Sequence, residues 1–351
     1  MSKLMPAAAI ALAVVTIGVV AGAMWVMPGS ILTSEPSAAL GPTPASGVAN
    51  VTIKDGEAAG KIGQDLQSAG VIQSATLFRV LVALMGQEDQ LQAGDYEFDK
   101  GMTTLATIDR IHNGITAPLM VTIPEGLRVE EIAALLDAKG VVSKADFMKA
   151  VADRRAEAVV AGDASGTLDG YLFPATYGFS REVTADEAVQ KMLDAFNEQV
   201  LPVVQPDLAA TGLTLDQVLT LASIVEREAV KPEERPLIAS VYINRLNIGM
   251  PLEADPTVQY ALGNDPQNVE AFGYWKTELS ADDLKVDSPY NTYVNNGLPP
   301  GPIACPGLDS IRAVLHPAQT NYLYFVAKGD GSHVFAETLE EHLRNVQLYQ
   351  H

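Results

Sequence analysis

The stretch TLDQVLTLASIVERE, from Thr214 to Glu228, contains the clearest helix signal in the chain. Thr214 and Gln217 have the spacing of a capping box, which predicts a helix with Thr214 as its N-cap that runs to about Ala229. At about 100° per residue, the apolar side chains of this stretch fall on one stripe. The members of the stripe are Leu215, Val218, Leu219, Ala222, Val225 and Ala229. We therefore expect a central helix that packs into a core.

Glu226 falls within this apolar stripe, four residues after Ala222. Burial raises the pKa of a carboxyl group, so a carboxyl on a core-facing stripe is paired, protonated or functional. A carboxyl that keeps its proton near neutral pH can act as a general acid, as glycosidic cleavage requires. The alternative is a structural ion pair with Arg235 or Arg245 from the next helix. The helix alone leaves both interpretations open.

The composition excludes several classes of function. The 351 residues include 43 acidic and 23 basic side chains, a net charge of -20 that would repel a nucleic acid. A single cysteine, Cys305, excludes a disulfide within the chain and lies in a proline-bounded loop without a nearby histidine. His316 and His333 belong to no H-x-x-x-H pair, so we expect no metal. No cofactor is expected either.

The first residues have the character of a membrane anchor. Pro6 to Met27 is an uninterrupted apolar run, long enough to span a hydrocarbon core of about 30 Å. Lys3 precedes the run and the next basic residue is Lys54, so the positive-inside rule keeps the N-terminus cytoplasmic. We expect a single-pass protein of the inner membrane with the bulk of the chain periplasmic. A cleaved signal sequence is the alternative.

The expected organisation has four parts and an α+β fold. A cytoplasmic stub and transmembrane anchor occupy residues 1–30, and a Pro- and Ser-rich flexible linker follows over residues 31–48. A small strand-helix region occupies residues 49–150, and a mixed α+β catalytic domain occupies residues 151–351.

Residues 49–150 contain a repeated pattern. Its first part predicts a βααβ unit with strands at 51–53 and 94–98 and helices at 57–69 and 75–85. Val51-Thr52-Ile53 returns as Val121-Thr122-Ile123, and the matching apolar positions of the following helices also recur. The βααβ layout resembles a LysM-type glycan-binding module. A purely structural role for this region is the alternative.

The region after Glu228 contains several short motifs. A second helix is expected from Pro236, ending before Gly249. The segments that follow are Asp255-Pro-Thr, Ser288-Pro-Tyr-Asn-Thr-Tyr293, Leu298-Pro-Pro-Gly301, His316-Pro, Tyr322-Leu-Tyr-Phe-Val326 and Gly331-Ser-His-Val-Phe335. Together with Leu221 to Glu228, these segments closely resemble the YceG-like endolytic murein transglycosylases, over almost the whole chain.

This resemblance implies that Glu226 is the catalytic glutamate of an enzyme that cleaves peptidoglycan glycan strands. The segment from Leu168 to Tyr177 also fits, although the family usually has an acidic residue where Ala175 stands, so we expect no essential side chain there. The residue types at seven further positions suit substrate binding: Asn244, Arg245, Asp255, Tyr290, Asn291, Tyr293 and His333. The alternatives are structural: helix capping by Asn244 and Arg245, a turn at Asp255, and core packing of the two tyrosines.

The implied reaction is lytic: an acid protonates the glycosidic oxygen, and the C6 hydroxyl of N-acetylmuramic acid closes on C1 to leave a 1,6-anhydro end. A hydrolase would instead use a second carboxylate, for which Asp255 is the candidate. A non-enzymatic peptidoglycan-binding scaffold is a third reading. The resemblance also implies cleavage within nascent strands and association with synthases of the elongation machinery.

Overall fold

The computed structural model of the chain describes residues 47–160 and 167–350, and its fold is mixed α+β, as expected. The expected anchor, residues 1–30, and nearly all of the expected linker lie outside the described residues. Within the described part of the chain, no helix combines the length and apolar character needed to cross a membrane. Strand β1 begins at Val48, inside the expected linker.

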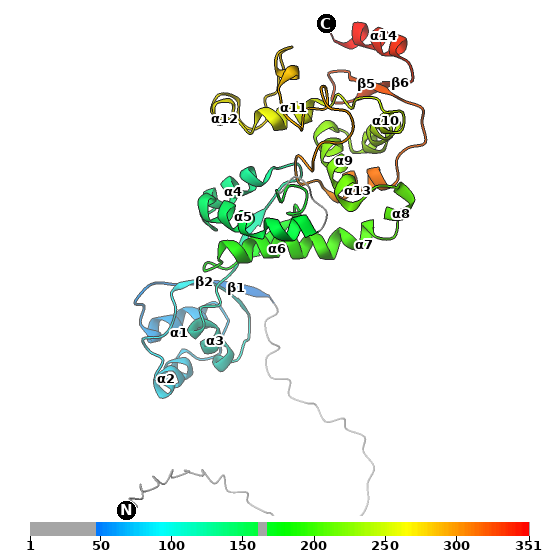
Figure 1. Cartoon of the computed structure of the whole chain (residues 1–351). Helices are drawn as coiled ribbons and strands as arrows, with labels where there is room; N and C mark the ends of the chain where they lie inside the picture. The colour runs from blue at the N-terminus through cyan, green and yellow to red at the C-terminus, as the bar shows by residue number, and fades with distance from the viewer. Residues whose placement is uncertain (1–46, 161–166, 351) are drawn as a thin grey trace, which may run out of the picture. The chain divides into compact units, whose positions relative to one another are not determined.

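The first structural unit has its own core. Strand β1 pairs antiparallel with β2, with Val51 opposite Tyr96, and the buried side chains of the unit form one cluster. Gly86 ends α2 in the left-handed conformation (φ 65°), which glycine adopts without steric cost. The elements are β1 (Val48–Ile53), α1 (Ala59–Ser68), α2 (Ala75–Met85), β2 (Gly94–Asp99) and α3 (Thr104–His112) (Figure 1).

The second unit repeats this order of elements. Its strands also pair antiparallel, with Val121 opposite Tyr177. The repeated strand-helix pattern expected from the sequence falls on these two units, and each unit has the element order βααβα. The boundary expected after residue 150 falls inside α5. The elements are β3 (Leu119–Thr122), α4 (Val129–Ala138), α5 (Lys144–Val160), β4 (Thr176–Phe179) and α6 (Ala185–Gln199).

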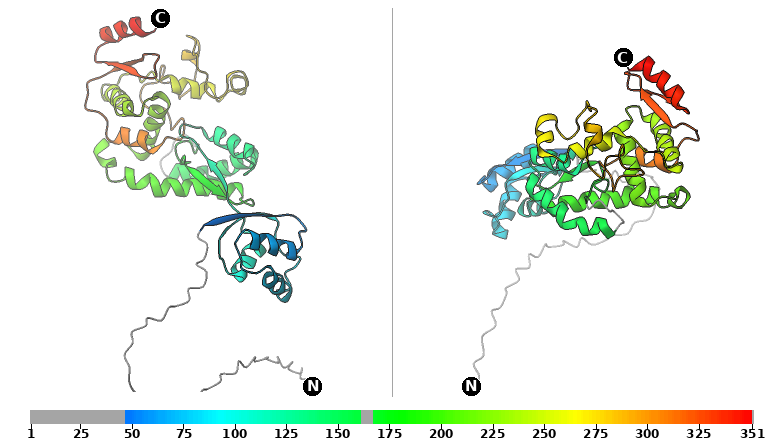
Figure 2. Two further views of the ribbon diagram at one scale, coloured as in Figure 1. Left: turned by 180° about the vertical axis from the view of Figure 1, so that it is seen from behind. Right: turned by 45° about the horizontal axis from the view of Figure 1, so that its top comes forward.

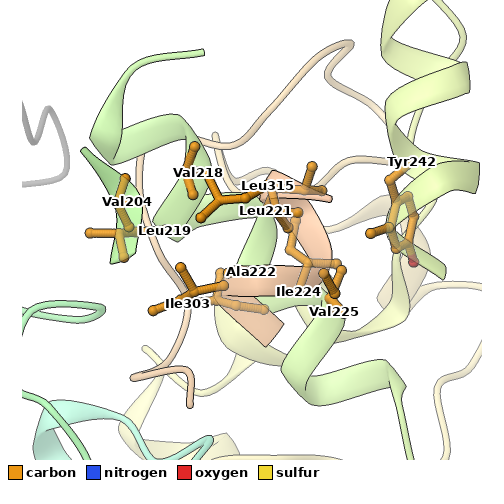
Figure 3. Close-up of a cluster of buried hydrophobic side chains, with 14 of the residues drawn as sticks. Val204, Val218, Leu219, Leu221, Ala222, Ile224, Val225, Tyr242, Ile303 and Leu315 are labelled. Carbon is orange, nitrogen blue, oxygen red and sulfur yellow. The ribbon is translucent and has the colours of Figure 1, made fainter. Parts of the chain in front are cut away.

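Helix α9 (Leu215–Glu228) lies at the centre of the largest core. The hydroxyl of Thr214 accepts a hydrogen bond from the Gln217 amide at 3.2 Å, and the Gln217 side chain accepts one from the Thr214 amide at 2.9 Å, which confirms the capping box. Figure 3 shows Leu221, Ala222 and Val225 of this helix among apolar side chains from other elements.

Helices that follow α6 contribute further side chains to this core: α7 (Leu201–Val204), α8 (Leu208–Thr211), α10 (Arg235–Asn247), α11 (Asp255–Leu262) and α13 (Leu308–Leu315). Among the described residues, helix α12 (Pro266–Phe272) and the 3-10 turns η1 (Pro232–Glu234) and η2 (Asp283–Lys285) contribute none of its side chains.

The C-terminal part is a hairpin covered by a helix. Strands β5 (Tyr324–Ala327) and β6 (His333–Ala336) pair antiparallel, and α14 (Leu339–Tyr349) packs against both. The three elements lie together in both views of Figure 2.

Candidate active site

Both oxygens of the Glu226 carboxylate accept hydrogen bonds from the protein. Arg235 Nη2 donates to Oε1 at 3.2 Å, while the Ser310 hydroxyl (2.6 Å) and the Gly307 amide (3.1 Å) donate to Oε2. The side chains of Glu226 and Arg235 are only 8% and 12% exposed. The ion pair with Arg235, which the sequence left as an alternative to catalysis, is thus present.

A different carboxyl group of the same helix faces a cavity. Glu228 lies two residues after Glu226, about 200° around the helix, and lines a cavity of about 340 Å³. The Tyr242 hydroxyl of α10 donates a hydrogen bond to Glu228 Oε1 at 2.7 Å. Burial raises the pKa of the Glu228 carboxyl to about 7; the hydrogen bond from Tyr242 opposes this rise, and the charge of Asp255 adds to it. Glu228 therefore has the raised pKa that the apolar stripe predicts for Glu226.

Asp255 and Tyr293 line the same cavity. The Tyr293 hydroxyl donates to Asp255 Oδ1 at 2.6 Å, and burial together with this bond raises the pKa of the tyrosine. Asp255 is the first residue of α11, where a carboxylate interacts favourably with the helix dipole. Just before it, Glu253 has a positive φ of 48°, which is uncommon outside glycine and often marks a functional loop.

Arg245 also lines the cavity, but its guanidinium is engaged by the protein. It donates to the Leu323 carbonyl at 2.6 Å and to the Leu252 carbonyl at 2.8 Å. Asn244 donates through its amide to the Thr320 and Tyr322 carbonyls. These two residues therefore hold the loop before α11 and the segment before β5 in place around the cavity.

Of the other three predicted residues, only His333 lines the cavity. Asn291 is buried and donates to the Leu284 and Val286 carbonyls. The ring of Tyr290 packs on that of Tyr260, with 4.6 Å between centroids. His333 lines the cavity, and its Nδ1 lies 2.7 Å from a carboxylate oxygen of Glu234. The structure thus brings together Asp255, Tyr293, His333 and Arg245, with Glu228 in place of Glu226.

No group of three or more His, Cys, Asp or Glu side chains within residues 47–160 and 167–350 is arranged to hold a metal ion. The chemistry that the cavity offers is proton transfer by carboxyl groups, with tyrosine hydroxyls and histidines as hydrogen-bonding partners.

The fold and the cavity define an α+β protein in which two βααβα units precede a helical core with a buried acid. A family model, the YceG-like family, matches residues 51–348, and the chain belongs to this family. It is 36% identical over 314 residues to the endolytic murein transglycosylase of Bacillus subtilis, covering 86% of this chain and 84% of that protein.

Two further comparisons agree with this membership. The endolytic murein transglycosylase of Streptococcus pneumoniae serotype 2 is 33% identical over 322 residues, which make up 84% of this chain but only 57% of that protein. A crystal structure of a yceG-like protein from Listeria monocytogenes is 35% identical, with a TM-score of 0.58, and the match covers 85% of this chain and 98% of that one.

Proposed function

We propose that the chain is an endolytic murein transglycosylase, which cleaves the glycosidic bond between N-acetylmuramic acid and N-acetylglucosamine within peptidoglycan strands. Membership of the family supports the substrate class. The observation that carries the mechanism is the Glu228 carboxyl, which lines a cavity and whose pKa burial raises to about 7. Glu228, rather than Glu226, is the proposed acid.

Glu228 donates its proton to the glycosidic oxygen as the bond from that oxygen to C1 of N-acetylmuramic acid breaks. The C6 hydroxyl oxygen of the same sugar then bonds to C1, and its proton passes to the Glu228 carboxylate. The product carries a 1,6-anhydro end, no water is consumed, and Glu228 regains its starting state. The Tyr242 hydroxyl stabilises the carboxylate form between the two transfers.

Asp255 favours a second candidate function, a glycan hydrolase, because it places another carboxylate in the same cavity. Digestion of uncrosslinked glycan strands followed by mass spectrometry separates the two reactions, since an anhydro end is lighter than a reducing end by one water. We expect anhydro ends from the wild-type protein and from Asp255→Asn. Reducing ends from the wild type would favour the hydrolase, and an absence of cleavage would favour a binding scaffold.

The first unit, β1 to α3, is proposed to be a LysM-like glycan-binding module, on the basis of its βααβ layout. The apolar run from Pro6 to Met27 supports the proposal of an inner-membrane anchor with the enzyme in the periplasm, where nascent strands and their synthases meet. Added protease tests this location: we expect the protein to be protected in intact cells and digested in spheroplasts.

A further inference from the structure

Helix α14 forms part of the wall of the cavity that contains Glu228. His342, Val346 and Gln350 of this C-terminal stretch line the cavity, although no residue of the helix is buried. The helix rests on the β5–β6 hairpin (Figure 2). Val326 and His333 of this hairpin line the same cavity. The catalytic cavity is therefore bordered by an element far from Glu228 in sequence.

The two histidines of this wall differ in their hydrogen bonding. His333 places Nδ1 against the Glu234 carboxylate. His342 stacks its ring on Tyr324, with centroids 5.1 Å apart and an interplanar angle of 24°, and its buried Nδ1 has no hydrogen-bond partner among the described residues. Because Nδ1 is enclosed and the residue lines the cavity, Nε2 is the nitrogen that a ligand can reach.

The surroundings of His342 determine which nitrogen carries the proton. Burial lowers the pKa of this imidazole, and the charge of Arg245 lowers it further, so the ring is neutral near pH 7. A buried N–H group without an acceptor is rarer in proteins than an unused acceptor. The hydrogen therefore belongs on Nε2, which makes His342 a hydrogen-bond donor toward the cavity.

We propose that His342 is a substrate-binding residue that donates its Nε2–H to the carbonyl oxygen of a sugar N-acetyl group. An acetamido group fits this wall in two ways, because its oxygen accepts one hydrogen bond and its methyl group suits the apolar side chains of Val326 and Val346. A glucosamine or muramic acid without the acetyl group has neither this acceptor oxygen nor this methyl group. The inference rests on the proposed function and adds a basis for recognising N-acetylated strands.

The test measures binding of uncrosslinked glycan strands by the full-length chain in detergent, with Glu228→Gln to prevent cleavage. Two ligands are compared: fully N-acetylated strands and the same strands after chemical de-N-acetylation. His342→Phe keeps a ring to stack on Tyr324 but removes the donor. We expect it to weaken binding of acetylated strands roughly 3- to 10-fold, the effect of one neutral hydrogen bond, with no change for deacetylated strands.

Gln347→Ala, an exposed change on the same helix, is the matched control and should bind as the parent does. His342→Gln retains a donor and should recover part of the affinity, which guards against a general effect of the Phe variant on folding. Equal affinity of the parent and His342→Phe for acetylated strands, or equal losses for both ligands, overturns the role of His342. Failure of the parent to bind either strand would instead count against the proposed function.

Discussion

At the scale of single residues, two carboxyl groups of one helix have different environments and therefore different properties. Glu226 is surrounded by donors, among them a guanidinium, so its carboxylate joins α9 to Arg235 and α13. Glu228 receives one hydrogen bond, from a tyrosine hydroxyl, inside a cavity. Separating a structural carboxyl from a titrating one is a recurrent way of assigning acid chemistry in enzymes.

The pH dependence of cleavage should follow the Glu228 carboxyl. Its folded pKa of about 7 lies above the ordinary value of 4.5, so the acid is present below pH 7 and is lost as the pH rises through that value. The Tyr242 hydroxyl lowers this pKa, so Tyr242→Phe should move the falling limb of kcat/KM to higher pH. Initial cleavage rates between pH 5 and 9 for both proteins check this. A falling limb at the same pH in both proteins would show that Glu228 is not the group whose titration limits cleavage.

Loss of the Glu226 ion pair should reduce stability. Glu226→Gln leaves the largely buried Arg235 without a charged partner, which should cost about 3 kcal/mol of the free energy of unfolding. Urea unfolding of the fragment 47–351 measures this. Glu340→Gln, which removes the partner of an exposed arginine on α14, is the control and should change stability by less than about 0.5 kcal/mol. Similar values for the two variants would contradict the structural role of Glu226.

The sequence predicts the helix and its cap correctly, but it does not predict the enclosed environment of Glu228. The apolar stripe of α9 reports which face packs against the core, and Glu226 lies on that face. The face that carries Glu228 is covered by Tyr242 of α10, a contact that hydrophobic periodicity does not contain. The motif from Leu221 to Glu228 includes both glutamates, and only the tertiary contacts distinguish them.

At the scale of elements, the chain uses one βααβα arrangement twice. The second strand of each unit, β2 or β4, carries the same pair of aromatic rings. Tyr96 packs on Phe98 and Tyr177 on Phe179, at centroid distances of 5.6 Å and 5.8 Å. The first strand and helix of the repeat can be recognised in the sequence, because matching positions in the two units are separated by the same number of residues. The rest of the repeat cannot be recognised in this way, because α5 and the segment after it are longer than the corresponding part of the first unit.

The capping box of α9 should contribute to stability without affecting catalysis. Thr214→Ala removes the acceptor for the Gln217 amide at the end of the helix opposite Glu228, which should cost about 1 kcal/mol. Thr214→Ser keeps the hydroxyl and should remain close to wild type. Urea unfolding measures the loss of stability. The folded variants should cleave glycan strands at the same rate as the wild type. A large fall in rate for Thr214→Ala would show that the cap influences the cavity.

At the scale of the whole molecule, the second unit shares side chains with the helical core, whereas the first unit does not. Ala175, Leu193 and Ala195 pack against both the core of the second unit and the core around α9. The buried cluster of the first unit contains residues only between Val51 and Ile111. The second unit therefore belongs to the catalytic part, while the first has an independent core.

Removal of the first unit should leave the catalytic part folded. We expect the fragment 118–351 to show a cooperative thermal transition and to cleave isolated strands, because the ion pair of Asp95 with Arg181, which is lost with the first unit, is exposed and contributes little to stability. Circular dichroism and product analysis check both properties. A fragment without a transition would show that the first unit is required for folding.

The central claim is that Glu228 supplies the proton. Its most direct test compares Glu228→Gln with Glu226→Gln, both confirmed to be folded, by mass spectrometry of the products from uncrosslinked strands. We predict that Glu228→Gln releases no anhydro-muramyl product, while Glu226→Gln still releases it at a temperature where it is folded. Release of product by Glu228→Gln, with none from folded Glu226→Gln, would contradict the assignment.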